Sequence, residues 1–159
     1  MKPFAHVLVP TDFSEGAARA TELAAELAVS FDARLTLLHV VSTPTAAALW
    51  YAEGLTYPVE EIYTAARREL ERAGEVVRRV HPAVATVLAG GDPRDEILSS
   101  TRELGADLVV MGTHGRRGLE RLVLGSTAES VVRTSRVPVL VVGRATSPST
   151  SPRAAAPYA

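Results

Sequence analysis

Four residues with a fixed spacing could bind phosphate. Gly112 and Gly115 follow a β-branched run. After nine intervening residues, Gly125 and Ser126 begin a helical pattern. Glycines let backbone N–H groups approach an anion without interference from Cβ and permit positive φ, and a helix start offers unpaired N–H groups with a favourable dipole. This strand, loop and helix arrangement is therefore a candidate phosphate site.

The same residues also have a purely structural interpretation. Ser126 and Glu129 match a capping box, with Ser126 as the N-cap and Glu129 at N3. A hydroxyl can accept from the N3 amide while it donates to a phosphate oxygen, so the two interpretations are compatible. Because glycine-rich turns also serve only as turns, the spacing alone leaves both open.

A carboxylate, Asp12, follows the first β-branched run in the segment VPTDFS. Either Asp12 or Ser14 can cap the next helix. In open parallel sheets, however, ligands bind beyond the carboxyl ends of the strands, where the strand order reverses. If the runs ending at Val9 and Met111 are neighbours, Asp12 and Gly112 face one crevice. Asp12 can there accept hydrogen bonds from a ribose or an adenine.

Short β-branched runs alternate with longer helical patterns along the chain. The predicted strands are His6–Val9, Arg34–Val41, Val84–Leu88, Asp107–Met111 and Val137–Val142. This alternation is typical of βαβ units with a parallel sheet, and nearly continuous apolar runs are expected for strands covered on both faces. The sequence therefore predicts the α/β class.

Helical periodicity and end signals predict the covering helices. One helix opens near Ser14, and a charged helix spans about Val59–Val80. Another has Asp92 as its N-cap, Pro93 at its first position and Gly105 as its stop. The residues predicted to be buried on the first helix are Ala20, Leu23, Ala24, Leu27, Ala28 and Phe31. Those on the helix that begins at Pro93 are Ile97, Leu98, Thr101 and Leu104.

The length of 159 residues and the 47% hydrophobic content indicate one domain. We expect this domain to span residues 1–144. Residues 145–159 are rich in Ser, Pro and Ala and are predicted to form a disordered tail. Residues 42–57 lack a clean period and are predicted to be an irregular excursion.

Composition excludes several classes. The net charge of −1 provides no global positive field for nucleic acid or an anionic membrane, and the absence of cysteine excludes disulfide scaffolds and thiolate metal sites. The chain has neither a run of apolar residues long enough for a membrane helix nor a secretory signal. We therefore expect a soluble, cytoplasmic protein. His39 is predicted to be a packed core histidine, and His6 and His81 show no metal-ligand spacing.

The PTDFS turn, the LHVV segment and the stretch from MGTHGRRG through LGSTAES resemble the ATP-binding branch of the universal stress protein family. The family pattern of Gly, two residues, Gly, nine residues, Gly and Ser or Thr is matched by Gly112, Gly115, Gly125 and Ser126. The resemblance covers about Lys2 to Arg144. It implies a five-stranded parallel sheet of order 3-2-1-4-5 with helices on both faces, a Rossmann-like open sandwich, and ATP with Mg²⁺ as the ligand.

The resemblance also implies the site residues. They are Pro10, Thr11, Asp12, Val40, Met111, Gly112, Gly115, Gly125, Ser126 and Thr127, and we add His114 and Arg116 of the loop as candidates. The first three line the adenosine pocket, and the backbone of Val40 hydrogen-bonds adenine. Met111 and Gly112 flank the ribose and phosphates, and the remaining glycines with Ser126 and Thr127 cradle the triphosphate.

The charged residues of the loop keep two interpretations. Arg116, Arg117 and Arg121 either reach the outer phosphates or form a solvated basic loop. His114 either contacts phosphate or is simply exposed.

Catalytic signatures are missing from the sequence. It has no Gly-Lys-Ser or Gly-Lys-Thr, no Gly-x-Ser-x-Gly elbow and no positioned general base, so any hydrolysis is expected to be slow. The leading hypothesis is an ATP-binding regulatory or stress-protective module rather than a dedicated enzyme. The alternatives are a slow ATPase or phosphotransferase with autophosphorylation, and a dimeric interaction protein that does not use nucleotide. The apolar run Val137–Val142, expected at a sheet edge, predicts a homodimer.

Overall fold

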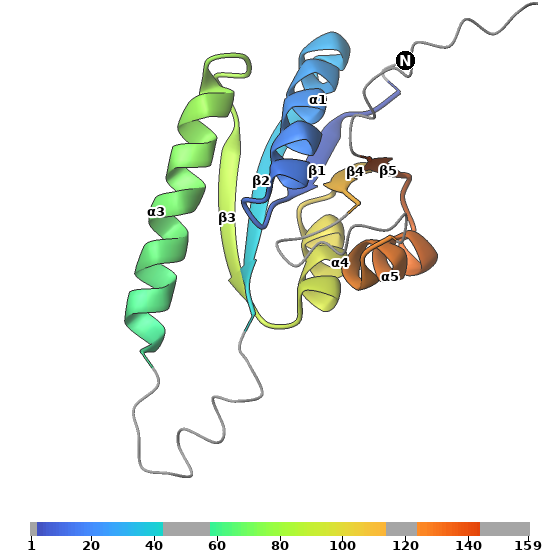
Figure 1. The fold of residues 1–159 in the computed structure, drawn as a ribbon. Helices are drawn as coiled ribbons and strands as arrows, with labels where there is room; N and C mark the ends of the chain where they lie inside the picture. The colour runs from blue at the N-terminus through green and yellow to red at the C-terminus, as the bar shows by residue number, and fades with distance from the viewer. Residues whose placement is uncertain (1–2, 43–57, 114–123, 144–159) are drawn as a thin grey trace, which may run out of the picture.

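A computed structural model describes residues 3–42, 58–113 and 124–143 of the chain. Its strands are β1 (His6–Pro10), β2 (Arg34–Val41), β3 (Ala85–Gly90), β4 (Leu108–Gly112) and β5 (Val139–Val142). They form one five-stranded sheet of order β3-β2-β1-β4-β5 (Figure 1). The paired strands are all parallel. This confirms the fold class and the strand order.

Helices cover both faces of the sheet. They are α1 (Glu15–Phe31), α3 (Val59–Arg78), α4 (Pro93–Glu103) and α5 (Ser126–Thr134). Figure 1 shows α1 and α3 on one side of the sheet and α4 and α5 on the other. The helices α1 and α3 lie in the connections from β1 to β2 and from β2 to β3. The helices α4 and α5 lie in the connections from β3 to β4 and from β4 to β5, which run in the opposite direction across the sheet. Because parallel crossovers are right-handed, this reversal of direction places the two pairs on opposite faces.

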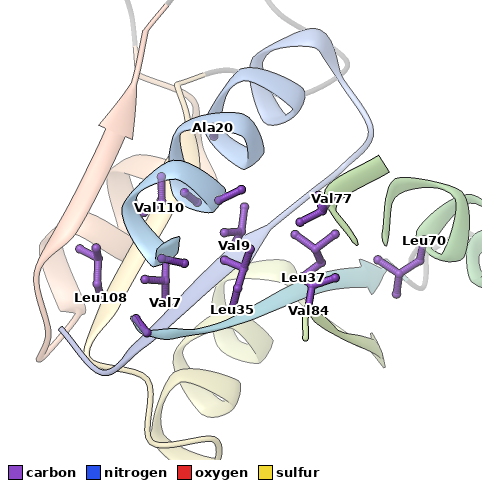
Figure 2. Close-up of a cluster of buried hydrophobic side chains, with 14 residues drawn as sticks. Val7, Val9, Ala20, Leu35, Leu37, Leu70, Val77, Val84, Leu108 and Val110 are labelled. Carbon is purple, nitrogen blue, oxygen red and sulfur yellow. The ribbon is translucent and has the colours of Figure 1, made fainter. Parts of the chain in front are cut away.

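Successive side chains of the central strands point alternately into two separate hydrophobic cores. Val7 and Val9 join Leu35 and Leu37 beneath the buried alanines of α1, as Figure 2 shows. Leu8 and Leu38 point the other way and pack with the residues of α4 and α5. This alternation, with both faces apolar, is why the strands read as continuous hydrophobic runs.

The helix ends follow the predicted signals at α4. Asp92 accepts hydrogen bonds from the amides of Arg94 and Asp95, at 3.0 and 3.3 Å, and Pro93 occupies the first helical position. Gly105 follows the helix with φ of 64°, a left-handed conformation that suits glycine. The predicted start and stop of this helix are confirmed.

Several predicted boundaries shift by one or a few residues, three of them for local reasons. The side chain of Ser135 closes a turn by bonding both the amide and the carbonyl of Val137, so β5 begins only at Val139. The carboxylate of Asp107 accepts from the amide of Ala5 at 2.8 Å and lies before β4. At the end of α3, the amide of Val80 turns back to the carbonyl of Val77, which ends the helix at Arg78.

Other predictions fall partly outside the described residues. The irregular excursion at 42–57 lies there from residue 43 onward, as does the tail at 145–159. None of the helices in the described part of the chain combines the length and the apolar character needed to span a bilayer.

Candidate functional site

The turn after β1 is held by a dense set of hydrogen bonds. The amide of Thr11 donates to the carbonyl of Leu38 at 2.8 Å, and its hydroxyl accepts from the amide of Phe13 at 3.1 Å. Asp12 Oδ1 accepts from the amide of Ser14 at 3.1 Å. Ser14 is the N-cap of α1, since its hydroxyl accepts from the amide of Ala17. Of the two capping candidates, Ser14 takes this position, and Asp12 orders the turn that precedes it.

Phe13 adopts a strained backbone conformation in this turn. Its φ is 63°, in the left-handed region that residues with a Cβ rarely enter. Such a conformation costs on the order of 1 kcal/mol or more and persists only where the surroundings enforce it. The sequence analysis did not identify this residue, because a phenylalanine carries no signal for positive φ.

His39 contacts the same turn from β2. Its Nδ1 donates to the carbonyl of Thr11 at 2.7 Å, since a carbonyl can only accept. Its ring lies against that of Phe13, with centroids 4.3 Å apart and planes tilted by 34°. The histidine expected to pack in the core is half-buried. Through its contacts with Thr11 and Phe13 it is also a neighbour of the candidate site.

Two expected site elements are adjacent across the sheet. β1 pairs directly with β4, so the turn carrying Asp12 and the end of β4 at Met111 and Gly112 extend from neighbouring strands. The strand order reverses between these two strands, because the connection from β1 leads to β2 whereas that from β4 leads to β5. This is the switch point at which open α/β sheets bind ligands.

Gly112 has a packing role in addition to any role at the site. A Cβ built on Gly112 would lie 2.8 Å from the carbonyl carbon of Gly16, in the first turn of α1. Glycine is therefore required here for close approach of a helix to a strand. Among the glycines that the structure describes, positive φ occurs at Gly91 and Gly105, not at Gly112 or Gly125.

The start of α5 is drawn back to the end of β4. The amide of Gly125 donates to the carbonyl of Thr113 at 2.7 Å, and the amide of Thr113 donates to Val142. These bonds bring the two ends of the glycine-rich stretch together. They also occupy the amide of Gly125, so the anion donors at this end begin with Ser126.

The predicted capping box at α5 is wrong. Gly125, not Ser126, is the N-cap, and it makes no side-chain capping bond. Ser126 is thus the first helical residue, and the first amide bonded within the helix is that of Glu129, to the carbonyl of Gly125. The amides of Ser126, Thr127 and Ala128 have no partner within the helix.

Charge and exposure at this helix start suit an anion. Ser126 is exposed, and Thr127 is half-buried. Glu129 forms an ion pair with Arg133 one turn further along, which directs its carboxylate towards the end of the helix. The positive end of the helix dipole therefore has hydroxyl and amide donors beside it.

Val40 lies at the carboxyl end of β2, two residues beyond Leu38, whose carbonyl binds the Asp12 turn. It pairs in register with Ala89 of β3. His114, Gly115 and Arg116 lie outside the described residues, as do Arg117 and Arg121.

The other histidines have structural partners. His6 donates through Nδ1 to the carbonyl of Leu104 and accepts through Nε2 from the hydroxyl of Thr36. His81 donates through Nε2 to the carbonyl of Ala33. The described ranges contain no cluster of His, Cys, Asp or Glu suited to a metal ion.

The fold and the positions of the candidate residues together define a class of protein: a doubly wound α/β domain whose candidate ligand site lies at the switch point between β1 and β4. Within this class, the chain belongs to the universal stress protein family, whose model matches residues 3–143.

Individual relatives agree with this assignment. The universal stress protein MJ0531 of Methanocaldococcus jannaschii is 34% identical over 137 residues, which cover 86% of this chain and 80% of the relative. The structure of UspA from Lactobacillus plantarum is similar, with a TM-score of 0.72 and 26% identity, covering 87% of this chain and 97% of that protein. A universal stress protein in complex with cAMP is similar over 87% of this chain and 96% of its own, with 25% identity and a TM-score of 0.62.

Proposed function

We propose that this chain binds an adenine nucleotide, ATP with Mg²⁺, between the turn after β1 and the start of α5. The observation that carries the proposal is the adjacency of β1 and β4, which sets a half-buried carboxylate and a helix start without a side-chain capping bond at one end of the sheet. A nucleotide needs acceptors for its nucleoside and donors for its phosphates, and these two elements supply them. The relative in complex with cAMP supports the adenine base.

The adenosine would be bound on the β1 and β2 side. Pro10 and Thr11 line this part of the site, and Asp12 accepts from the ribose or the adenine. The backbone of Val40, at the end of β2, would hydrogen-bond the adenine edge. The bonds that fix the turn, from Thr11 to Leu38 and from Ser14 to Asp12, keep these groups in place.

The phosphates would be bound on the β4 and α5 side. Met111 and Gly112 would flank the ribose and the first phosphate, and the amides and hydroxyls of Ser126 and Thr127 would donate to the outer ones. Gly125 would act through the bond that holds the helix start at Thr113. His114, Gly115 and Arg116 complete the proposed set.

Mg²⁺ would be held chiefly by phosphate oxygens and water, as is usual for this ion. This fits the residues present, because the described residues on the phosphate side of the site offer amides and hydroxyls rather than a cluster of carboxylates. The ion would neutralise phosphate charge, while the chain itself binds and orients the nucleotide. We propose that occupancy changes the surface offered to a partner, as in a regulatory or stress-protective module.

We also propose that the protein is a homodimer through β5. This strand lies at an edge of the sheet and exposes Leu140, with 37% of its surface accessible. An apolar edge strand with an unpaired ladder favours pairing with a second copy around a two-fold axis.

A thermal-unfolding series with ATP, ADP, GTP and cyclic AMP tests the nucleotide proposal. A ligand at about one hundred times its dissociation constant stabilises the folded state by about 2.7 kcal/mol. Stabilisation by ATP that exceeds that by GTP is expected, because the Val40 backbone would contact the base. Absence of any shift with millimolar adenine nucleotide would refute the proposal.

A further inference from the structure

The contacts of His39 go beyond those of a core residue. The side chain emerges near the end of β2 and reaches two successive parts of the turn after β1: it donates to the carbonyl of Thr11 at 2.7 Å and stacks on the ring of Phe13 at 4.3 Å. These contacts flank Asp12 on both sides along the chain. The imidazole of His39 thus contacts the residue before Asp12 and the residue after it.

The two contacts differ in what they fix. The bond to the Thr11 carbonyl sets the orientation of the peptide that enters Asp12. The stacked ring supports Phe13 in a conformation, with φ of 63°, that the residue would not adopt alone. Enforced positive φ at this point lets Asp12 Oδ1 accept from the amide of Ser14, at 3.1 Å, before α1 begins.

We infer that His39 is a positioning residue of the nucleotide site, which orients Asp12 by holding Thr11 and Phe13 on either side of it. The inference rests on the proposed function for its consequence in binding, whereas its structural part is independent of any ligand. His39 acts through Asp12 and need not touch the nucleotide.

Hydrogen exchange in the free protein tests the structural part. In His39→Leu, the amide of Ser14 should exchange about tenfold faster or more, because the carboxylate that it binds is no longer held. The amide of Thr11, bonded to Leu38 across the sheet, serves as the internal control and should change little. Equal protection of Ser14 in wild type and His39→Leu would overturn the inference.

Calorimetric titration with ATP tests the consequence for binding. His39→Leu should weaken the affinity about tenfold, and His39→Asn, whose amide can replace Nδ1–H as donor to Thr11, should recover part of that loss. His81→Leu is the matched control, because it removes a similar bond, of 2.9 Å to the carbonyl of Ala33, which precedes β2 at the other end of that strand. It should leave the affinity unchanged.

A double-mutant cycle separates positioning from general destabilisation. If His39 acts through Asp12, adding His39→Leu to Asp12→Asn should change the affinity by less than about twofold. Fully additive losses would contradict the inference. If wild type does not bind ATP, the proposed function fails and the effect on binding fails with it, whereas exchange at Ser14 still decides whether His39 holds the turn.

Discussion

Gly112, the last residue of β4, lies against the backbone of Gly16 in the first turn of α1. A Cβ on Gly112 would be 2.8 Å from the carbonyl carbon of Gly16 and 3.0 Å from its oxygen. Neither backbone atom can move without displacing the helix. The absence of a Cβ at Gly112 therefore lets the start of α1, and with it the Asp12 turn, lie close to the end of β4.

Substitution at Gly112 should destabilise the protein even without nucleotide. Gly112→Ala forces α1 away from β4, and overpacking of this kind costs about 1–3 kcal/mol. Urea unfolding measures the loss. Gly143→Ala is the matched control, since its added Cβ would meet nothing within 4 Å. Equal stability of the two variants would show that the contact between Gly112 and Gly16 does not constrain the fold.

Two serines at helix starts should behave differently. Ser14→Ala removes the N-cap of α1 and should lower the free energy of unfolding by about 1 kcal/mol. Ser126→Ala should change it by less than about 0.5 kcal/mol, because Gly125 caps α5. Ser126→Ala should instead weaken ATP binding. A large stability loss in Ser126→Ala would restore the capping interpretation.

The charge of Asp12 should matter to binding more than to stability. Asp12→Asn keeps an oxygen that can accept from Ser14, but it removes the charge available to a nucleoside donor. We expect ATP affinity to fall about tenfold or more in calorimetric titration. Glu22→Gln, an equal change of charge on the exposed face of α1, should bind as wild type does. Unchanged binding by Asp12→Asn would remove this carboxylate from the site.

Acid should destabilise the fold through His6. Burial, aided by the positive charge of Arg34, lowers the pKa of His6 below its ordinary value of 6.5. The unfolded chain then binds more protons than the folded one, so stability is present above pH 6.5 and is lost as the pH falls through the folded pKa. Urea unfolding between about pH 5.5 and 7.5 should show a shallower slope in His6→Asn. Parallel slopes would assign the acid sensitivity to other groups.

A charge on the β5 edge should separate the dimer. Leu140→Glu places a carboxylate on the exposed edge and should shift the protein to monomer in light scattering at micromolar concentration. Val76→Glu is the control, because Val76 is exposed on α3, the helix that joins β2 to β3 on the other side of the sheet. A wild-type protein that is monomeric under these conditions would contradict the dimer proposal.

The amino-acid sequence by itself determined the elements and several of their ends. Alternating β-branched runs and helical stripes predicted the α/β class, since these periods follow from which face each residue buries. Asp92, Pro93 and Gly105 marked the ends of α4 correctly, because capping depends on residues only a few positions apart. The strand order came from the family resemblance rather than from periodicity.

Only the tertiary structure decided which groups meet. The contact of Gly112 with Gly16 and the bond from His39 to Thr11 join segments that lie far apart in the chain, and the cap of α5 at Gly125 goes with the bond from its amide to Thr113. Such contacts follow from how helices pack on the sheet, and the spacing of residues along the sequence does not indicate that packing. For this reason the sequence identified Asp12 and Ser126 as candidates but misassigned the cap of α5, and it assigned His39 to the core without its contacts to Thr11 and Phe13.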